Sequence, residues 1–373
     1  MRLFEKLSAR GKLFKAFRAA GVYLGEKDKP IFPKIHSVKV EDVFMEFVFT
    51  LPTGLDPKQI QKNEYVFKQV FGEQIEIDGE YKTFTLIVYK KPLPKILKYN
   101  PQEILEEIKE HSLGIVCGKD RNGQYMSYDL LKQPHLLIAG ETGSGKSTQL
   151  RSILTSLILC KNPKELELYL ADCKKSEFHI FRKVEHVQCV LSNQREIKRM
   201  LKHIKKELDE RSNLTEVFEV SHIDDLPEEQ KRPYLIVCID EFVMLRNDQE
   251  IMDILIEIVA IGRTLGVFAI LSMQRPNGKV LDTTIRANLT VSMGFKLRDK
   301  IESRIVNTPG AEKLKEPGQF IMSSDEEYHL IAPYLTMGDA KKLLNPFMVN
   351  KSAKEVKEEK KRLTESDVFN DVK

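Results

Sequence analysis

The sequence predicts an α/β fold in which a doubly wound, mostly parallel sheet follows a small α+β domain. Between residues 101 and 346, short apolar runs alternate with stretches of helical pattern. Continuous apolar runs of this kind are typical of parallel strands that are buried on both faces. Residues 31–100 instead show strand-like stretches around one short helix. A chain of 373 residues, at roughly 100–200 residues per domain, has room for both domains and a sizeable core.

The composition, 42% hydrophobic and 31% charged, is that of an ordinary globular chain. The 59 basic and 55 acidic residues leave a net charge of +4, which neither identifies nor excludes a polyanionic partner. The most apolar stretch, 255–273, contains Glu257 and Arg263, so we expect no transmembrane span. Scattered cysteines without metal-ligand spacing indicate a reducing, cytoplasmic compartment, with neither a disulfide framework nor a zinc site.

The N-terminal segment, residues 1–30, begins with a predicted basic amphipathic helix. Residues 1–20 carry six basic residues and one acidic residue, Glu5. Apolar residues recur among them at roughly helical spacing: Leu3, Phe4, Leu7, Phe14 and Phe17. Such a helix can lie weakly on an anionic membrane surface or on nucleic acid. The alternative is a helix that caps the following domain and leaves its basic face solvated.

Residues 31–100 are predicted to form the small α+β domain. A strand-like pattern over 38–49 precedes a turn-rich stretch, and 65–71 is predicted as a short helix. Residues 75–80 are predicted as a turn between strands, and the β-rich run 83–89 as a strand. Residues 90–94, with two prolines, have the composition of an exit linker.

Residues 101–346 are predicted to form the doubly wound domain. Five buried strands are expected at His135–Ala139, Leu166–Ala171, Tyr234–Ile239, Val267–Ser272 and Val291–Phe295. Residues 347–373 are mostly charged and polar after the first few, so a frayed helix or a disordered tail is expected there.

A phosphate-binding loop follows the first of these strands. The run Gly140–Ser147 matches the pattern G-x-x-x-x-G-K-[ST] at every fixed position, and a helical stretch follows it. Its glycines allow the backbone to wrap around a polyphosphate, and the amides at the helix start face the anion. Lys146 is expected to reach the β- and γ-phosphates, and the Ser147 hydroxyl to ligate Mg²⁺. The predicted nucleotide-binding residues are Gly140, Glu141, Thr142, Gly143, Ser144, Gly145, Lys146, Ser147 and Thr148.

Two later strands are predicted to bring polar groups to the same nucleotide. Asp240 and Glu241 follow the strand 234–239, and this pairing favours nucleotide hydrolysis. We expect Asp240 to hold Mg²⁺ through water and Glu241 to orient and activate the attacking water. Gln274 ends the next strand, where its amide is suited to sensing the γ-phosphate.

These motifs, with others in the same order, resemble the motor of the FtsK/SpoIIIE DNA translocases. The resemblance covers roughly residues 113–335 and is far more specific than a phosphate loop alone. The matching segments are 113–123, 128–140, 233–242, 262–268, 273–276, 285–288, 310–314 and 317–320.

The resemblance implies a RecA-like ATPase that binds ATP with Mg²⁺ and works as a ring, usually of six subunits, around double-stranded DNA. Arg263 occupies the family's Gly/Ala-Arg-x-x-Gly position, which implies an arginine finger that enters a neighbour's ATP site. Residues 31–91 would correspond to the smaller domain of the family. DNA contact would be independent of sequence, and Lys279, Arg286 and Lys296 are the candidates for it.

The chain also departs from the cell-division members of that family. We expect neither their N-terminal membrane spans nor their C-terminal winged-helix domain, and Asp172-Cys173-Lys174 replaces their usual Asp-Pro-Lys. The chain is more similar to compact bacterial relatives borne on plasmids, phages and integrative elements. A role in transfer, segregation or replication of such an element is expected, with a relaxase or replication protein as a candidate partner. The alternatives are a protein-export ATPase and an adaptor switched by ATP.

Overall fold

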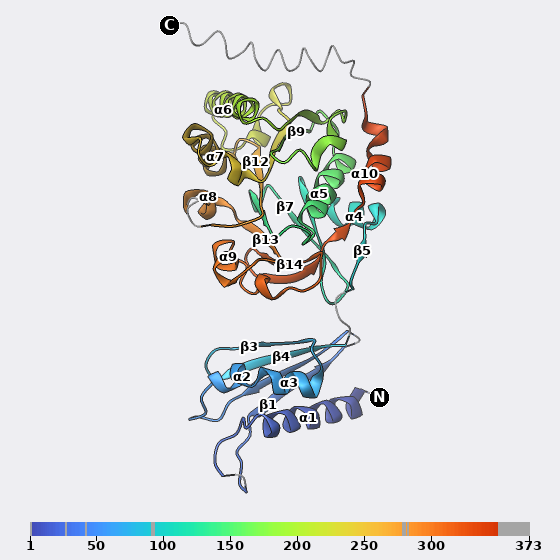
Figure 1. The fold of residues 1–373 in the computed structure, drawn as a ribbon, viewed down its shortest axis with the longest axis vertical. Coiled ribbons are helices and arrows are strands. Elements are labelled where there is room, and N and C mark those ends of the chain that lie inside the picture. The colour runs from blue at the N-terminus through green and yellow to red at the C-terminus, as the bar shows by residue number, and fades with distance from the viewer. Residues whose placement is uncertain are drawn as a thin grey trace. The chain divides into compact units, whose positions relative to one another are not determined.

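The computed structural model describes residues 2–26, 28–41, 43–90, 94–277, 281 and 283–349. It divides into two compact units, of which the first comprises Met1–Leu93 with Arg121–Gly123 and the second the remainder (Figure 1). The predicted tail from residue 350 onward and the candidate DNA contact Lys279 lie outside the described residues.

The first unit contains a four-stranded antiparallel sheet in the order β1-β2-β4-β3. Its elements are α1 (Arg2–Ala19), β1 (Lys34–Val40), β2 (Phe44–Thr50), α2 (Lys58–Lys62), α3 (Glu64–Phe71), β3 (Ile75–Asp78) and β4 (Thr83–Tyr89). The predicted turn over 75–80 is wrong in its first part, because Ile75–Asp78 forms strand β3. Ile75 is buried and pairs with Val88, so a partner distant in sequence decides its conformation.

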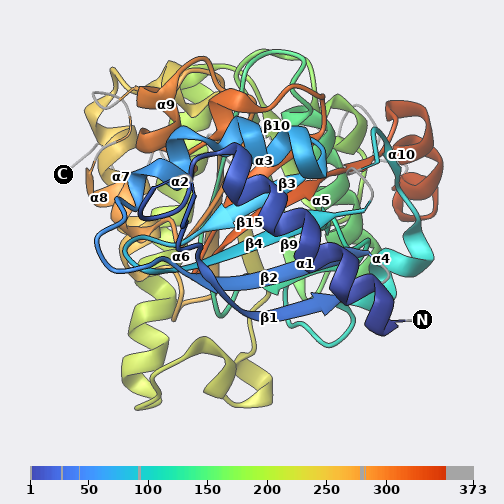
Figure 2. The same cartoon turned by 90° about the horizontal axis from the view of Figure 1, so that it is seen from below.

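Helix α1 belongs to the core of the first unit. It packs against β1 and α3, and Figure 2 shows it lying along the sheet. Leu13, Ala16 and Phe17 are fully buried, and the Phe17 ring lies 4.9 Å from that of Phe49. The helix therefore covers the sheet with one face, as the capping alternative expects, while Phe4 on another face is 81% exposed.

The second unit is built on a ten-stranded sheet, counted over the described residues, in the order β10-β9-β11-β12-β8-β13-β14-β15-β6-β7. The part from β10 to β13 is parallel, and the part from β13 to β7 is antiparallel. The strands are β6 (Gly114–Lys119), β7 (Tyr125–Asp129), β8 (Leu136–Ala139), β9 (Leu166–Asp172), β10 (Val187–Leu191), β11 (Tyr234–Asp240), β12 (Val267–Met273), β13 (Val291–Phe295), β14 (Gln319–Ser323) and β15 (Glu327–Ile331). All five predicted strands are present, and the prediction of a mostly parallel α/β sheet is confirmed. The antiparallel extension was not predicted.

Helices cover both faces of this sheet, as a doubly wound fold requires. α5 and α10 pack with one hydrophobic core, and α6, α7 and α8 pack with the other. Figure 1 shows α6 and α7 together, away from α5 and α10. The helices are α4 (Pro101–Ile108), α5 (Lys146–Cys160), α6 (Gln194–Val217), α7 (Gln249–Ile261), α8 (Thr283–Asn288), α9 (Lys300–Ile305) and α10 (Met337–Leu344). Within the described residues we find no helix with the length and apolar character that a membrane span requires.

The boundary between the units lies earlier than the expected one at residue 100. Strand β5 (Leu97–Lys98) pairs in parallel with β16 (Pro333–Tyr334), and Tyr99 donates its backbone N–H to the Tyr334 carbonyl. Because these hydrogen bonds join the segment to the C-terminal part of the chain, residues from Pro94 onward fold with the second unit. Segment 1–30 likewise shares its unit with the residues up to Leu93.

We expect His135 to make the stability of the second unit sensitive to acid. It is fully buried before β8, and its Nδ1 accepts the Ala269 N–H at 3.0 Å. Burial lowers the pKa of His135 from 6.5 to about 4. Between these values the unfolded chain holds a proton that the folded chain does not, so the free energy of unfolding should fall as the pH drops from 6.5 to 4. The loss should be on the order of 3 kcal/mol.

Chemical unfolding at several pH values between 7 and 4 checks this prediction. His135→Asn is a suitable comparison, because Asn keeps an acceptor near Nδ1 and tolerates the left-handed backbone, here φ 64°. In the variant, the free energy of unfolding should depend less on pH in this range, by the uptake of about one proton on unfolding. Identical pH dependence in both proteins would contradict the role of His135.

Candidate active site

The phosphate loop joins strand β8 to helix α5 and has the shape that its glycines allow. Gly143 and Gly145 have φ of 82° and 110°, in the region that favours glycine. A Cβ at Gly145 would lie 2.9 Å from the Gly318 nitrogen, and one at Gly140 would lie 2.6 Å from Cβ of Phe295. The backbone at both positions therefore approaches its neighbours too closely for any side chain.

Neighbouring segments hold this loop in place. The Ser144 carbonyl accepts the Gly318 N–H at 2.8 Å, and the Glu141 N–H donates to the Lys296 carbonyl at 2.9 Å. The Gly140 N–H donates to the carbonyl of Met273 at the end of β12. With three such hydrogen bonds, the loop is built before a nucleotide arrives. The first amides of α5 remain available to an anion.

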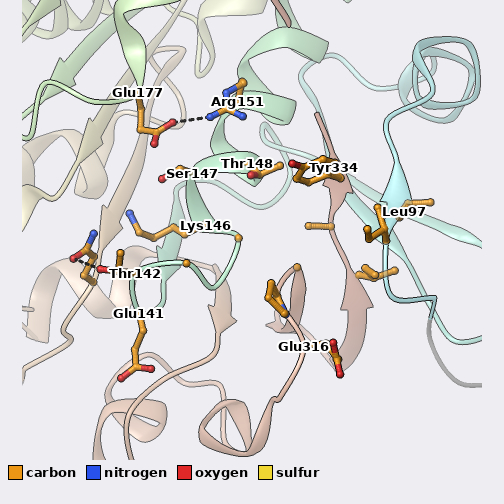
Figure 3. A pocket seen from close by; sticks show the side chains of 18 of the residues that line it. Leu97, Glu141, Thr142, Lys146, Ser147, Thr148, Arg151, Glu177, Glu316 and Tyr334 are labelled. Carbon is orange, nitrogen blue, oxygen red and sulfur yellow. Dashed lines mark hydrogen bonds and ion pairs between the residues drawn. The ribbon is translucent and has the colours of Figure 1, made fainter. Parts of the chain in front are cut away.

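A cavity of about 940 Å³ opens over the loop and has two different walls (Figure 3). One wall is polar and is formed by Thr142, Lys146, Ser147, Thr148, Lys174, Asp240 and Gln274. The other is largely apolar and is formed by Ile96, Leu97, Pro317, Ile331, Ala332 and Tyr334. Figure 3 shows Leu97 and Tyr334 on the side of the loop opposite Lys146. An apolar wall with one aromatic ring facing a phosphate loop suits a nucleotide with a planar base.

The apolar wall was missed by sequence analysis. Ile96 and Leu97 lie just after the expected linker, and Tyr334 lies near the end of the predicted domain. They meet only because β5 pairs with β16. A short, irregular apolar stretch carries no local sign of this long-range contact.

Lys146 and Asp240 form a buried ion pair. The Lys146 Nζ lies 2.8 Å from Asp240 Oδ1, and both residues are 3% exposed. Ser272 on β12 completes the cluster: its Oγ accepts from Lys146 at 2.7 Å and donates to Asp240 Oδ1 at 2.7 Å. Strand β12 lies between β8 and β11, so Ser272 lies between the two charges. Sequence analysis predicted the lysine and the aspartate but not this serine.

The same wall offers suitable groups for a divalent cation. Ser147 at the start of α5 and Asp240 at the end of β11 both line the cavity. A hydroxyl and a carboxylate are the hard oxygen donors that Mg²⁺ prefers alongside phosphate oxygens and water. The residues present therefore fit Mg²⁺ bound with a nucleotide.

Glu241 is held by two contacts and by a constrained backbone. Its Oε2 lies 2.7 Å from the Lys174 Nζ, and its Oε1 accepts the Gln274 N–H at 3.2 Å. The residue is 6% exposed and has φ 57°, a left-handed conformation that is costly outside glycine and persists at sites that the surrounding structure enforces. Lys174 was not predicted as a site residue, although sequence analysis noted the segment Asp172-Cys173-Lys174, in which Cys173 replaces the proline that is usual in the family.

Gln274 lies where the sequence predicted it, next to the phosphate loop. Its Oε1 accepts a hydrogen bond from the Thr142 hydroxyl at 3.2 Å. This contact joins the end of β12 directly to the loop, and both residues line the cavity. A change at the phosphate end of the cavity can therefore be transmitted to the segment after β12.

Arg263 lies elsewhere in the same unit. It follows α7, is exposed, and donates from Nε to the Leu131 carbonyl at 3.2 Å. Leu131 precedes β8, so this contact lies at the N-terminal edge of the parallel strands, whereas the phosphate loop follows their C-terminal edge. Arg263 does not line the cavity of its own subunit. The structure thus brings together the residues predicted for the nucleotide site, with the exception of Arg263.

Comparison with known proteins agrees with these motifs. The FtsK/SpoIIIE family model matches residues 106–229. The DNA translocase FtsK of Streptomyces avermitilis is 31% identical over 234 residues, which is 57% of this chain and 26% of that protein. The DNA translocase FtsK of Helicobacter pylori strain J99 is 33% identical over 281 residues, 71% of this chain and 33% of that protein. The chain thus spans about a quarter to a third of the length of these relatives.

Solved structures show the same fold. The pCW3 conjugation coupling protein TcpA superposes with a TM-score of 0.64 at 24% identity, covering 90% of this chain and 98% of that one. The cytoplasmic domain of the Thermomonospora curvata type VII secretion ATPase EccC superposes with a TM-score of 0.58 at 22% identity. This match covers 70% of this chain and 32% of that one. Motifs, fold and relatives agree: residues 106–229 carry a P-loop domain that matches the FtsK/SpoIIIE family.

Proposed function

We propose that this chain is an ATP-driven translocase of double-stranded DNA that works as a ring of identical subunits. The observation that carries the proposal is the placement of Arg263 at the sheet edge opposite its own phosphate loop. Within the described residues, the site has its phosphate-binding, metal-binding and water-activating groups, whereas Arg263 lies away from it. A neighbouring subunit would supply this arginine. Repeating one head-to-tail contact closes a ring when the rotation permits, and a hexamer is the form we expect.

Within each site, we assign the steps of hydrolysis to named residues. Lys146 leaves Asp240 and binds the β- and γ-phosphates of ATP, and Ser147 and Asp240 would hold Mg²⁺. When bound, Mg²⁺ supplies neutralisation of phosphate charge. Glu241 orients the attacking water and accepts its proton, and Gln274 responds to the γ-phosphate. Arg263 of the adjacent subunit stabilises the charge of the transition state.

The apolar wall gives the adenine base its place. Tyr334 is 53% exposed and Ile96 is 64% exposed, so both have surface to offer a planar ring. Stacking on an aromatic side chain and burial of aliphatic surface favour a base without reading its edge. We therefore expect the wall to contribute to affinity more than to selectivity between purines.

The proposed DNA substrate is inferred from the relatives of this chain. The proteins of Streptomyces and Helicobacter that match this chain are described as DNA translocases, and they match it over 57% and 71% of its length. Arg286 on α8 and Lys296 after β13 are the described candidates for phosphate contacts. TcpA, which matches nearly the whole chain, is described as a conjugation coupling protein. A match over nearly the whole chain supports a role with a mobile element, and favours transfer of that element over its segregation or replication. A relaxase or replication protein would be the partner.

A second candidate function is protein export. EccC, which shares the fold, is described as a type VII secretion ATPase. Export would use the same ATP site and would leave hydrolysis insensitive to duplex DNA. An ATP-switched adaptor is the third candidate, and the presence of both Glu241 and Arg263 favours an enzyme that turns over.

Hydrolysis measured with and without long linear duplex DNA, at low and high salt, tests the proposal. We expect strong stimulation at low salt that declines steeply as salt rises, because the contacts are to phosphates. Displacement of a triplex-forming strand should accompany hydrolysis and should be lost in Glu241→Gln. No stimulation at any salt concentration would overturn the DNA motor and favour export or the adaptor. Stimulation without displacement would leave a DNA-dependent ATPase that does not translocate.

A further inference from the structure

Two lysines each hold one of two consecutive carboxylates at the phosphate end of the cavity. Lys146 pairs with Asp240 at 2.8 Å, and Lys174 pairs with Glu241 at 2.7 Å. Lys146 and Lys174 both line the cavity. Lys146 belongs to the phosphate loop, whereas Lys174 comes from the loop after β9 and has no role in the predicted site. The arrangement suggests that both lysines act on the same ligand.

The loop that carries Lys174 is fixed to the nucleotide site. The Asp172 carboxylate accepts the backbone N–H groups of Ser176, Glu177 and Phe178 at 2.9–3.1 Å. Glu177 in turn pairs with Arg151 of α5 at 2.8 Å, a contact that Figure 3 shows. The loop backbone is therefore tied to the helix that follows the phosphate loop. The Lys174 side chain is 35% exposed, so it keeps room to move within the cavity.

The pairing engages both oxygens of the Glu241 carboxylate. Oε2 accepts a hydrogen bond from the Lys174 ammonium, and Oε1 accepts one from the backbone N–H of Gln274. A carboxylate that acts as a general base must offer an oxygen to the attacking water within about 2.6–3.2 Å. A carboxylate oxygen can accept more than one hydrogen bond, but the ammonium 2.7 Å from Oε2 lowers the basicity of that oxygen. Glu241 therefore becomes a better proton acceptor when Lys174 moves away.

An incoming γ-phosphate is the group that can draw Lys174 away. It adds negative charge at the polar wall, and charge-assisted hydrogen bonds from an ammonium to phosphate are among the strongest in proteins. ADP lacks this group. We propose that Lys174 binds the γ-phosphate of ATP and in doing so releases Glu241 to accept the proton of the attacking water. This inference rests on the proposed role of Glu241, and it gives a γ-phosphate-binding role to Lys174, which the sequence analysis did not assign to the site.

Nucleotide affinity tests the inference without any need for turnover. With Mg²⁺ present, Lys174→Ala should weaken binding of the slowly hydrolysed analogue ATPγS about tenfold or more and change ADP binding less than about twofold. Lys175→Ala is the matched control: it removes the same charge from the same loop, at an exposed residue that does not line the cavity. The control should keep the wild-type ratio of ATPγS to ADP affinity.

A second pair of variants separates phosphate binding from a purely structural ion pair. Glu241→Gln removes the charged partner of Lys174, so it should tighten ATPγS binding, and Lys174→Ala in that background should reverse the gain. If Lys174→Ala does not fold, Lys174→Met provides the same test, because it keeps the side-chain length without the charge. It should show the same loss of ATPγS affinity. An unchanged ATPγS-to-ADP ratio in the Lys174 variants would overturn the inference. If the ratio shifts while Glu241→Gln still hydrolyses ATP at the wild-type rate, only the role of Glu241 fails.

Discussion

Lys146→Ala should abolish nucleotide binding, whereas Glu241→Gln should retain binding and lose turnover. Lys146 supplies positive charge to the phosphates, so its loss should weaken ATP and ADP binding by about a hundredfold or more. Glu241 acts only on the attacking water, so its replacement should lower kcat by about 10²–10⁴-fold without weakening ATP. Binding of a fluorescent nucleotide and steady-state hydrolysis, measured on both variants, check the two results.

Folding must be controlled in this comparison, because Lys146→Ala leaves Asp240 buried without its cation. Such a change is destabilising in its own right, and only the Ser272 hydroxyl remains as a partner within the cluster. Thermal unfolding without nucleotide shows whether the variant remains folded. Lys164→Ala, an exposed lysine in the turn after α5, is a control that should bind and hydrolyse normally. Wild-type hydrolysis by Glu241→Gln would show that another group activates the water.

Arg263→Ala should bind ATP nearly normally and hydrolyse it about 10³-fold more slowly, because an arginine finger acts mainly in the transition state. Its side chain lies at the N-terminal edge of the sheet, away from its own cavity. We therefore expect the defect to be complemented between subunits. A mixture of Arg263→Ala with Lys146→Ala should regain activity wherever an intact phosphate loop meets an intact finger. Neither parent contains such an interface.

The alternative role for Arg263 lies within its own subunit. It follows the C-terminal end of α7, where a basic side chain favourably opposes the negative pole of the helix. On that account, mixing recovers nothing at any ratio, even in samples shown to form mixed oligomers. Arg232→Ala is the matched control, since it removes another exposed arginine just before β11, at the same edge of the sheet. It should hydrolyse ATP at close to the wild-type rate.

The sequence by itself determined the features that depend on local patterns. The five buried strands are recognisable because a strand that is buried on both faces forms a continuous apolar run, whichever strands lie beside it. The phosphate loop is recognisable because its glycines and its lysine occupy fixed spacings between a strand and a helix. Asp240, Glu241 and Gln274 were predicted because they follow such strands, and parallel strands bring their carboxyl ends to one edge. The structure places Asp240 and Gln274 in the lining of one cavity and brings Glu241 into contact with Gln274.

Only the tertiary structure decided which of these groups touch. Strand order places β12 between β8 and β11, and so puts Ser272 between Lys146 and Asp240. The register of β9 and β11 pairs Asp172 with Asp240, which brings Lys174 to Glu241.

The tertiary structure also decided the conformation of segments with weak local signals. Ile75–Asp78 became a strand because β4 was available to pair with it, and α1 joined a core because its apolar face met β1 and α3. The apolar wall formed because β5 pairs with β16 across most of the second unit's sequence. In each case the deciding interaction joins residues distant in the chain. The free energy of that interaction depends on the two segments coming together in space, so it cannot be predicted from a local pattern of residues.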